Sequence, residues 1–149
     1  MRPFLHLEVP QQIVEIIRSR MVSESPLECC GLLAGRIEDG VGVVLGHFPI
    51  RNDLASPTEY LTNARDLLAA TRTMRESGLT ELAIYHSHPA SEPVPSRTDL
   101  ERNTWGETVV HVIVGECDIR AWWLTADRYE EMPMHFDPPR SPPQTAPRG

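Results

Sequence analysis

Apolar residues near the N-terminus recur on one face of a helix. Between Pro10 and Met21 they lie at helical spacing, at Ile13, Ile16, Ile17 and Met21. Pro10 suits the first turn of a helix, because the N–H that proline lacks would have no partner there. Ser25-Pro26 then interrupts the pattern. The sequence therefore predicts a helix from Pro10 to Met21.

Two apolar runs follow, separated by a turn signal. The first spans Cys29–Ala34 and stops at Gly35, and the second spans Val41–Phe48. Glu38-Asp39-Gly40 lies between them and is typical of a tight turn, because aspartate and glycine accept the backbone angles that such turns require. We expect the two runs to form an antiparallel hairpin.

The next part of the chain combines a loop with a second helix. Arg51–Leu61 has the composition of a loop with one short extended piece. The segment Ala64–Ser77 is helical in pattern, with Asn63 placed to cap its start and Asp66 in its first turn. Gly78 suits the left-handed position that often ends a helix.

The remaining elements favour a mixed sheet. Leu79–His86 is typical of a strand buried on both faces, and Thr108–Val114 and Asp118–Leu124 predict two further strands. Ser96–Trp105 predicts a short helix between them. An order of helix, hairpin, helix, strand, short helix and hairpin indicates a mixed α/β fold in which helices cover a mixed β-sheet.

Length and charge limit the organisation and the partners. The 149 residues suit a single domain, which we expect over residues 1–136. The segment from 137 to 149 is dense in proline, and we expect a disordered tail there. The formal net charge of −7, without a cluster of lysine and arginine, argues against a nucleic-acid partner.

Cysteine usage and hydropathy indicate a cytoplasmic protein. Cys29, Cys30 and Cys117 are odd in number and two are adjacent, which argues against a disulfide framework. The N-terminus lacks the apolar run of a signal peptide, and no segment approaches the roughly 20 apolar residues that cross a bilayer. We expect a soluble cytoplasmic protein without a membrane partner.

The richest chemistry lies in His86-Ser87-His88-Pro89, followed by Ser96 and Asp99. Alternate side chains of an extended segment point the same way, so His86 and His88 share a face and Ser87 points to the other. Pro89 ends the strand ladder. Two imidazoles and a carboxylate are a plausible three-ligand metal site with a fourth position for water.

A second interpretation of Ser96 and Asp99 is structural. Ser96-Arg97-Thr98-Asp99 has the form of a capped helix start, with the acidic residue three positions after the cap. The two interpretations are compatible, because the positive end of a helix dipole favours an ionised carboxylate. The prolines at 89, 93 and 95 stiffen the connection that would return Asp99 to the histidines.

A thiol site is the weaker alternative. Cys29 and Cys30 are adjacent in an expected strand, so they face opposite sides and do not share one ion. We expect both to be small core residues. A cysteine nucleophile activated by His86 is the remaining form of this hypothesis, and Cys117 has no partner nearby in the sequence.

The spacing His86-Ser87-His88, seven residues, Ser96, two residues, Asp99 resembles the JAMM signature of the MPN-plus metalloproteases. The segment 28–35, which reads ECCGLLAG, is similar to the part of that family that carries a catalytic glutamate. The resemblance implies one Zn²⁺ per chain, bound by His86, His88 and Asp99. It also implies Glu28 as the general base and Ser96 as the oxyanion donor, on a cytidine-deaminase-like fold.

The chemistry itself requires a carboxylate near the metal-bound water. A zinc-bound water ionises near pH 7, and a carboxylate that does not bind the metal can then carry its proton. The residues alone leave the choice of carboxylate open. Glu92, between the ligands, is a rival, and Glu101 would point away around the helix. Glu28 is assigned by the resemblance.

The chain is more similar to the stand-alone prokaryotic members of the family than to the larger eukaryotic deubiquitinases. That resemblance implies a ubiquitin-like or sulfur-carrier protein as substrate, cut after its C-terminal Gly-Gly, for example to remove a C-terminal cysteine or tail. The loops Arg51–Leu61 and Pro89–Pro95 are the expected walls of a narrow groove, with Tyr60 and Trp105 either lining it or packing in the core.

Two other functions stay open on the sequence. One is a binding module for ubiquitin-like proteins that has lost catalysis, although this chain keeps every ligand. The other is an Fe(II) enzyme, because two histidines and a carboxylate also bind iron. The polar, bulky segment Leu100–Trp105 and His111, inside an expected strand, depart from the family pattern.

Overall fold

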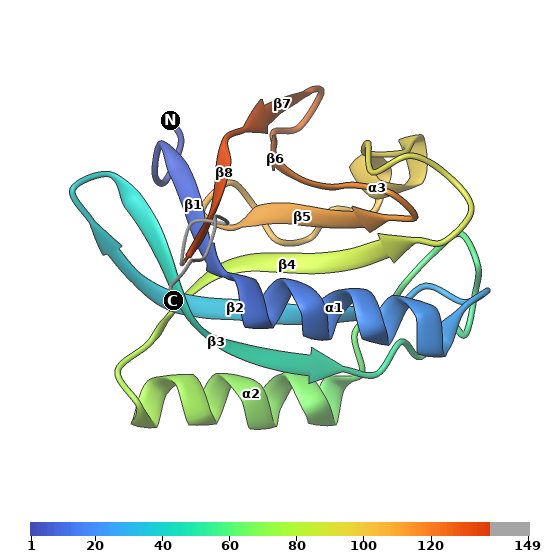
Figure 1. Cartoon of the computed structure of the whole chain (residues 1–149), viewed down its shortest axis with the longest axis horizontal. Coiled ribbons are helices and arrows are strands. Elements are labelled where there is room, and N and C mark those ends of the chain that lie inside the picture. The colour runs from blue at the N-terminus through green and yellow to red at the C-terminus, as the bar shows by residue number, and fades with distance from the viewer. Residues whose placement is uncertain (138–149) are drawn as a thin grey trace, which may run out of the picture.

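The computed structural model describes residues 1–137, which form one mixed sheet with helices on both faces (Figure 1). The strands are β1 (His6–Pro10), β2 (Cys30–Glu38), β3 (Val41–Ile50), β4 (Thr80–His88), β5 (Val110–Gly115), β6 (Ile119–Leu124), β7 (Tyr129–Met132) and β8 (Met134–Asp137). The helices are α1 (Gln11–Glu24), α2 (Ala64–Glu76) and α3 (Arg97–Glu101). The strand order is β7-β6-β5-β4-β2-β3-β1-β8.

The predicted mixed α/β class is confirmed. β2 and β3 form the expected antiparallel hairpin, and β4 lies between β2 and a parallel β5 at the centre of the sheet. The expected cap of α2 is also present, because Asn63 Oδ1 accepts a hydrogen bond from Asp66 N at 3.0 Å. Gly78 follows with a φ of 71°, in the left-handed region that suits glycine.

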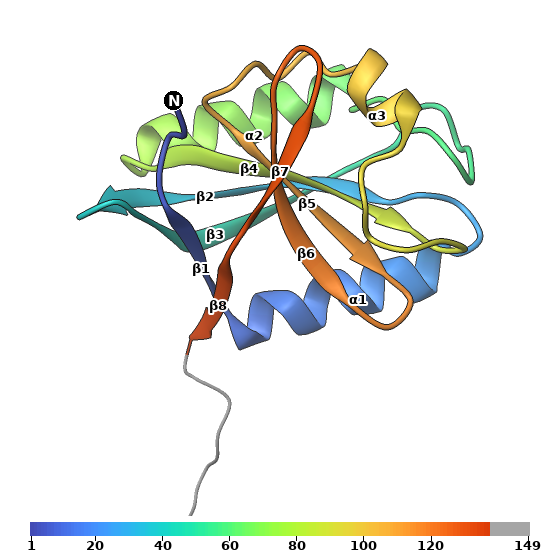
Figure 2. The same ribbon diagram turned by 90° about the horizontal axis from the view of Figure 1, so that it is seen from above.

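Each face of the sheet carries its own core. α1 packs on one face, over a cluster that includes Leu33 and Tyr85, and α2 packs on the other, over Leu32 and Ile84 (Figure 2). Cys29 belongs to the first cluster and Cys30 to the second. The prediction that the two cysteines face opposite sides is therefore confirmed.

Three strands were not predicted from the sequence. β1 pairs in parallel with β3 and with β8, and β7 extends the opposite edge beside β6. Each of the three has four or five residues. Short strands carry little periodicity, and the pairing of β1 with β3 and β8 joins segments that are far apart in the chain.

Some boundaries differ from those expected. β4 continues to His88, two residues beyond the predicted end, because its ladder with β5 extends to the His88–Gly115 pair. α3 is shorter than the predicted Ser96–Trp105 and ends at Glu101. Of the expected tail, Asp137 ends β8, and residues 138–149 lie outside the described part of the chain. Among residues 1–137, no helix has the length and apolarity to span a bilayer.

Candidate metal centre

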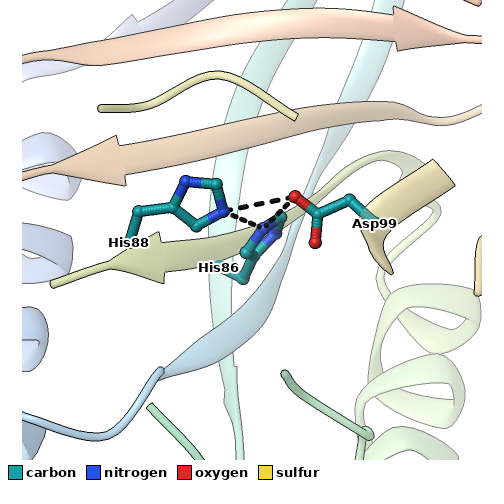
Figure 3. Close-up of side chains that lie close together, drawn as sticks. All are labelled: His86, His88 and Asp99. Atoms are coloured by element: carbon teal, nitrogen blue, oxygen red, sulfur yellow. Dashed lines mark hydrogen bonds and ion pairs between the residues drawn. The ribbon is translucent and has the colours of Figure 1, made fainter. Parts of the chain in front are cut away.

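Three ligand atoms meet where β4 ends. Strand alternation places His86 and His88 on one face, and the first turn of α3 brings Asp99 against them (Figure 3). The two Nε2 atoms are 3.2 Å apart, and each is 3.2 Å from Asp99 Oδ2. All three residues are buried. We call these residues the metal triangle.

The metal triangle fits a tetrahedral cation. Bonds of about 2.0–2.1 Å, typical of zinc with nitrogen and oxygen, require ligand atoms about 3.3–3.4 Å apart. His88 Nδ1 donates to the carbonyl oxygen of Glu92 at 2.8 Å, so the Nε2 of the neutral ring carries a lone pair. Two ring nitrogens and a carboxylate oxygen at this spacing are suited to share one positive ion.

The charges in this cluster follow from burial and from mutual contact. Burial lowers the pKa of His86 and keeps its imidazole neutral. Burial also raises the pKa of Asp99, but its contacts with both histidines and with the Ser96 amide outweigh this and leave the pKa far below its ordinary value. Asp99 is therefore ionised and supplies the negative charge of the metal triangle.

The helix cap aims the ligand. Ser96 Oγ accepts a hydrogen bond from Asp99 N at 3.1 Å, and Ser96 N donates to Asp99 Oδ2 at 2.9 Å. The capping interpretation is thus confirmed, and the Asp99 oxygen that accepts the amide bond is the same one that faces the histidines. The hydrogen bonds that cap α3 therefore also hold the Asp99 side chain toward the two histidines.

Glu28 is the carboxylate beside the metal triangle. It precedes β2, and because Cys30 pairs with His86 in an antiparallel ladder, the register places Glu28 across from His88. Its side chain is buried, and Oε1 has no hydrogen-bond partner among the described residues. Burial raises its pKa to about 8, with His88 lowering and Asp99 and Glu59 raising it. A buried carboxyl without a partner is costly and typical of functional sites.

The main chain around Glu28 is held by hydrogen bonds. Ser87, which points away from the histidines as predicted, donates its N–H to Cys29 O at 3.0 Å and accepts from Cys29 N through Oγ at 2.9 Å. Glu28 N donates to Ser56 O at 2.8 Å, and Asn52 Nδ2 donates to Glu28 O at 3.1 Å. The peptide that carries Glu28 is therefore fixed to β4 and to the loop after β3.

The two rival carboxylates lie at the surface. Glu92 is exposed, and the group it offers to the metal triangle is its main-chain oxygen. Glu101 is exposed and pairs with Arg97 at 3.4 Å, one turn away on α3. Of the three glutamates considered from the sequence, Glu28 is the one buried beside the ligands.

A cavity of about 210 Å³ opens beside Asp99. Its walls are the segment Glu59–Thr62 on one side and α3 with the residues after it on the other, through Thr98, Asp99, Arg102, Thr104 and Trp105. Tyr60 stacks on His86, with ring centroids 4.7 Å apart. Glu59 and Arg102 form an ion pair between the two walls.

The cavity includes one of the two loops that were expected to form a groove. The loop Arg51–Leu61 supplies one wall, and both Tyr60 and Trp105 line the cavity. The second wall is α3 and not Pro89–Pro95, because that segment is drawn onto the sheet, where Trp122 Nε1 donates to Pro93 O at 2.8 Å. The Pro89–Pro95 loop instead holds the ring of His88 through the Glu92 carbonyl oxygen.

His111 is buried in β5, beside Ile84 in the ladder with β4. Its Nε2 has no hydrogen-bond partner among the described residues, and burial lowers its pKa to about 3. The ring is therefore neutral at physiological pH. His86 lowers this pKa further and Asp99 raises it, so His111 lies within electrostatic reach of the metal triangle.

Comparison with known proteins agrees with this geometry. Residues 10–125 match the family described as prokaryotic homologs of the JAB domain. A probable TtuB-protein conjugate cleaving protease of Thermus thermophilus is 39% identical over 121 residues, which cover 80% of this chain and 77% of that protein. A desampylase of Haloferax volcanii is 30% identical over 129 residues, which cover 86% of this chain and 91% of that protein.

Two further likenesses extend the comparison. A CysO-cysteine peptidase of Mycobacterium tuberculosis is 34% identical over 98 residues, which cover 66% of each chain. A solution structure of a protein from Desulfitobacterium hafniense, 24% identical, has the same fold, with a TM-score of 0.80 over 88% of this chain and 92% of that one. The matched residues include Glu28 and the metal triangle, and the chain belongs to the family of prokaryotic homologs of the JAB domain.

Proposed function

We propose that this protein is a zinc metallopeptidase that hydrolyses the amide or isopeptide bond after the C-terminal Gly-Gly of a ubiquitin-like or sulfur-carrier protein. The observation that carries the proposal is the buried Glu28 carboxyl, without a hydrogen-bond partner among the described residues, beside a His-His-Asp triangle of ligand size. A metal site needs no such neighbour, whereas hydrolysis requires a group that moves a proton.

The relatives support the substrate class. One carries a name that refers to cleaving TtuB-protein conjugates, one is called a desampylase and one a CysO-cysteine peptidase. These names refer to different leaving groups, a conjugated protein in one and a cysteine in another. Their common feature is a small protein whose C-terminus is freed, and we assign that feature to this chain.

The residues for metal binding are His86, His88 and Asp99. When bound, Zn²⁺ supplies a Lewis acid that polarises the scissile carbonyl and lowers the pKa of a coordinated water. Three protein ligands, with the fourth position taken by water, are typical of a catalytic zinc site, and the metal triangle would supply those three. Nδ1 of His88 stays bonded to the Glu92 carbonyl and keeps the ring oriented.

Glu28 moves the proton. Burial raises the pKa of Glu28 in the metal-free site, and a bound Zn²⁺ would lower it, so the loaded site would hold the carboxylate that can accept a proton. In the proposed reaction it takes the proton of the attacking water and passes it to the leaving amine. The Ser96 hydroxyl accepts from Asp99 N, and its own O–H proton can be donated to the developing oxyanion.

The cavity accounts for a slender tail. A chain that reaches Asp99 must pass between the segment Glu59–Thr62 and α3, beside the rings of Tyr60 and Trp105. Two glycines present no side chains to these walls, and bulkier residues would have to displace them. In the proposed function, the narrow shape of this cavity selects substrates that end in Gly-Gly.

The test is a product analysis. The zinc-loaded protein is incubated with the host's ubiquitin-like carriers, each extended beyond its C-terminal Gly-Gly, and the products are weighed by mass spectrometry. We expect one cut, after Gly-Gly, and no cut when the two glycines are replaced by alanine. Cleavage of none of the carriers, or cleavage that survives complete removal of metal by a chelator, would refute the proposed function.

A further inference from the structure

Asn52, just after β3, uses all four hydrogen-bonding positions of its side-chain amide. Its Nδ2 donates to Glu28 O at 3.1 Å and to Glu59 O at 3.0 Å. Its Oδ1 accepts from Leu54 N at 3.0 Å and from Leu61 N at 2.9 Å. An asparagine can make two donor and two acceptor bonds, so this amide is fully satisfied.

These four bonds join two parts of the site that are separate in the chain. Glu28 carries the carboxyl beside the metal triangle, whereas Glu59 and Leu61 line the cavity. A main-chain bridge between Asn52 and Thr62 joins the two ends of the same loop. The side-chain amide of Asn52 therefore connects the Glu28 peptide to the Glu59–Thr62 wall, which a substrate tail would contact.

We propose that Asn52 is a positioning residue that sets the Glu28 carboxyl and the Glu59–Thr62 wall at a fixed spacing. The inference rests on the proposed function of Glu28 and of the cavity. A general base must lie within hydrogen-bond reach of the water it activates, and a displacement of about 1 Å can cost 10²-fold in rate. Because the Asn52 amide binds both the Glu28 peptide and the Glu59–Thr62 wall, a substrate tail that contacts this wall keeps a constant distance from the Glu28 carboxyl.

The chemistry of the amide allows its two halves to be tested separately. Aspartate has the same shape and keeps an oxygen for Leu54 N and Leu61 N, but it lacks the donors that reach Glu28 O and Glu59 O. Asn52→Asp thus removes the hydrogen bonds to Glu28 O and Glu59 O and keeps those from Leu54 N and Leu61 N. Asn52→Ala removes both sides.

The first measurement is steady-state cleavage of an extended carrier. We expect Asn52→Asp to lower kcat by about 10²-fold with a small change in KM, because base alignment is lost. Asn52→Ala should lower kcat similarly and also raise KM, because the wall is released. Both variants should bind one zinc with wild-type affinity in a chelator competition, since the ligands come from β4 and α3.

Asn63 offers a matched control. It is a buried asparagine at the end of the same loop, whose Oδ1 accepts from Asp66 N and whose Nδ2 donates to Asp53. Asn63→Asp makes the same chemical change without touching Glu28 or the cavity wall. We expect it to lower the free energy of unfolding but to leave kcat, KM and zinc affinity as in the wild type.

The second measurement does not depend on activity. Hydrogen exchange followed by NMR reports the Glu28 amide, which donates to Ser56 O, and the Leu61 amide, which donates to Asn52. In Asn52→Asp we expect at least tenfold faster exchange at Glu28, with Leu61 still protected, and in Asn52→Ala faster exchange at both. Asn63→Asp should leave both amides at wild-type rates.

Wild-type kcat together with wild-type exchange of the Glu28 amide in Asn52→Asp would overturn the inference. Equal losses of kcat in Asn52→Asp and Asn63→Asp would also overturn it, because the effect would then be general destabilisation. If the wild-type protein cleaves no carrier, the proposed function fails, and the exchange pattern alone decides whether Asn52 ties the Glu28 peptide to the wall.

Discussion

The metal triangle and the peptide that carries Glu28 are built in different ways. His86, His88 and Asp99 lie within fourteen residues, and a strand end and a capped first turn suffice to bring them together. Glu28 instead depends on partners far along the chain, since Asn52 lies 24 positions from Glu28 and Ser87 lies 58 positions from Cys29. We therefore expect that substitutions in the metal triangle abolish metal binding, whereas substitutions around the Glu28 peptide disturb the alignment of Glu28 and leave metal binding intact.

Loss of a ligand should give the largest effect. Asp99→Asn keeps the shape of the side chain in the α3 cap but removes the charge of the metal triangle. We expect zinc affinity to fall by more than about 10²-fold, beyond the effect of residues that only support a ligand, and cleavage to be lost. A chelator competition measures the affinity. Glu101→Gln, an exposed change on the same helix, is the control.

Loss of the base should separate the two regions. Glu28→Gln preserves shape and removes the group that moves the proton, so kcat should fall by about 10²- to 10⁴-fold. Zinc content should stay at one per chain, because Glu28 is outside the ligand set. Stoichiometry by elemental analysis and kcat on one carrier check this pair of outcomes. A Glu28→Gln protein with wild-type kcat would contradict the assignment.

A smaller effect is expected from Ser87, which joins the two regions. Ser87→Ala leaves the buried Cys29 N–H without its acceptor, at a cost of about 1–3 kcal/mol in the free energy of unfolding. We expect kcat to fall about tenfold, equal to about 1.4 kcal/mol, with zinc affinity unchanged. Ser87→Thr keeps the hydroxyl and should restore kcat, whereas failure of threonine to do so would count against a hydrogen-bonding role.

The last prediction concerns pH and the metal-free protein. The pKa of Glu28 rises from 4.5 to about 8 on folding, so the native state holds this proton more tightly than the unfolded state. Its contribution to stability is complete below pH 4.5 and is lost as pH rises through 8, at a slope of at most about 1.4 kcal/mol per pH unit.

Glu28→Gln removes this titration. Denaturant unfolding of both proteins from pH 5 to 8 should give a free energy of unfolding that falls more steeply with pH in the wild type than in the variant. Taking the difference cancels groups that do not sense Glu28, such as His111, whose pKa is lowered to about 3. The part of the His88 pKa that Glu28 raises remains in the difference. Parallel curves would mean that Glu28 titrates in the folded protein as it does in the unfolded chain.

Much of the central fold follows from local pattern. The hairpin of β2 and β3, the helix α2 with its Asn63 cap and the buried β4 each have a strong periodic or capping signal. The short strands β1, β7 and β8 lack one, since four or five residues show little periodicity. The second wall of the cavity was also missed, because the contact of Trp122 with Pro93 joins residues 29 positions apart.

The sequence by itself predicted the metal triangle, because strand alternation at His86 and His88 and the cap at Ser96 act over a few residues. It also placed Ser87 on the opposite face. Only the tertiary structure decided that Glu28 faces His88, that Tyr60 stacks on His86 and that Asn52 spans base and wall. These depend on the register of β2 against β4 and on closure of one loop, and both are set by long-range contacts.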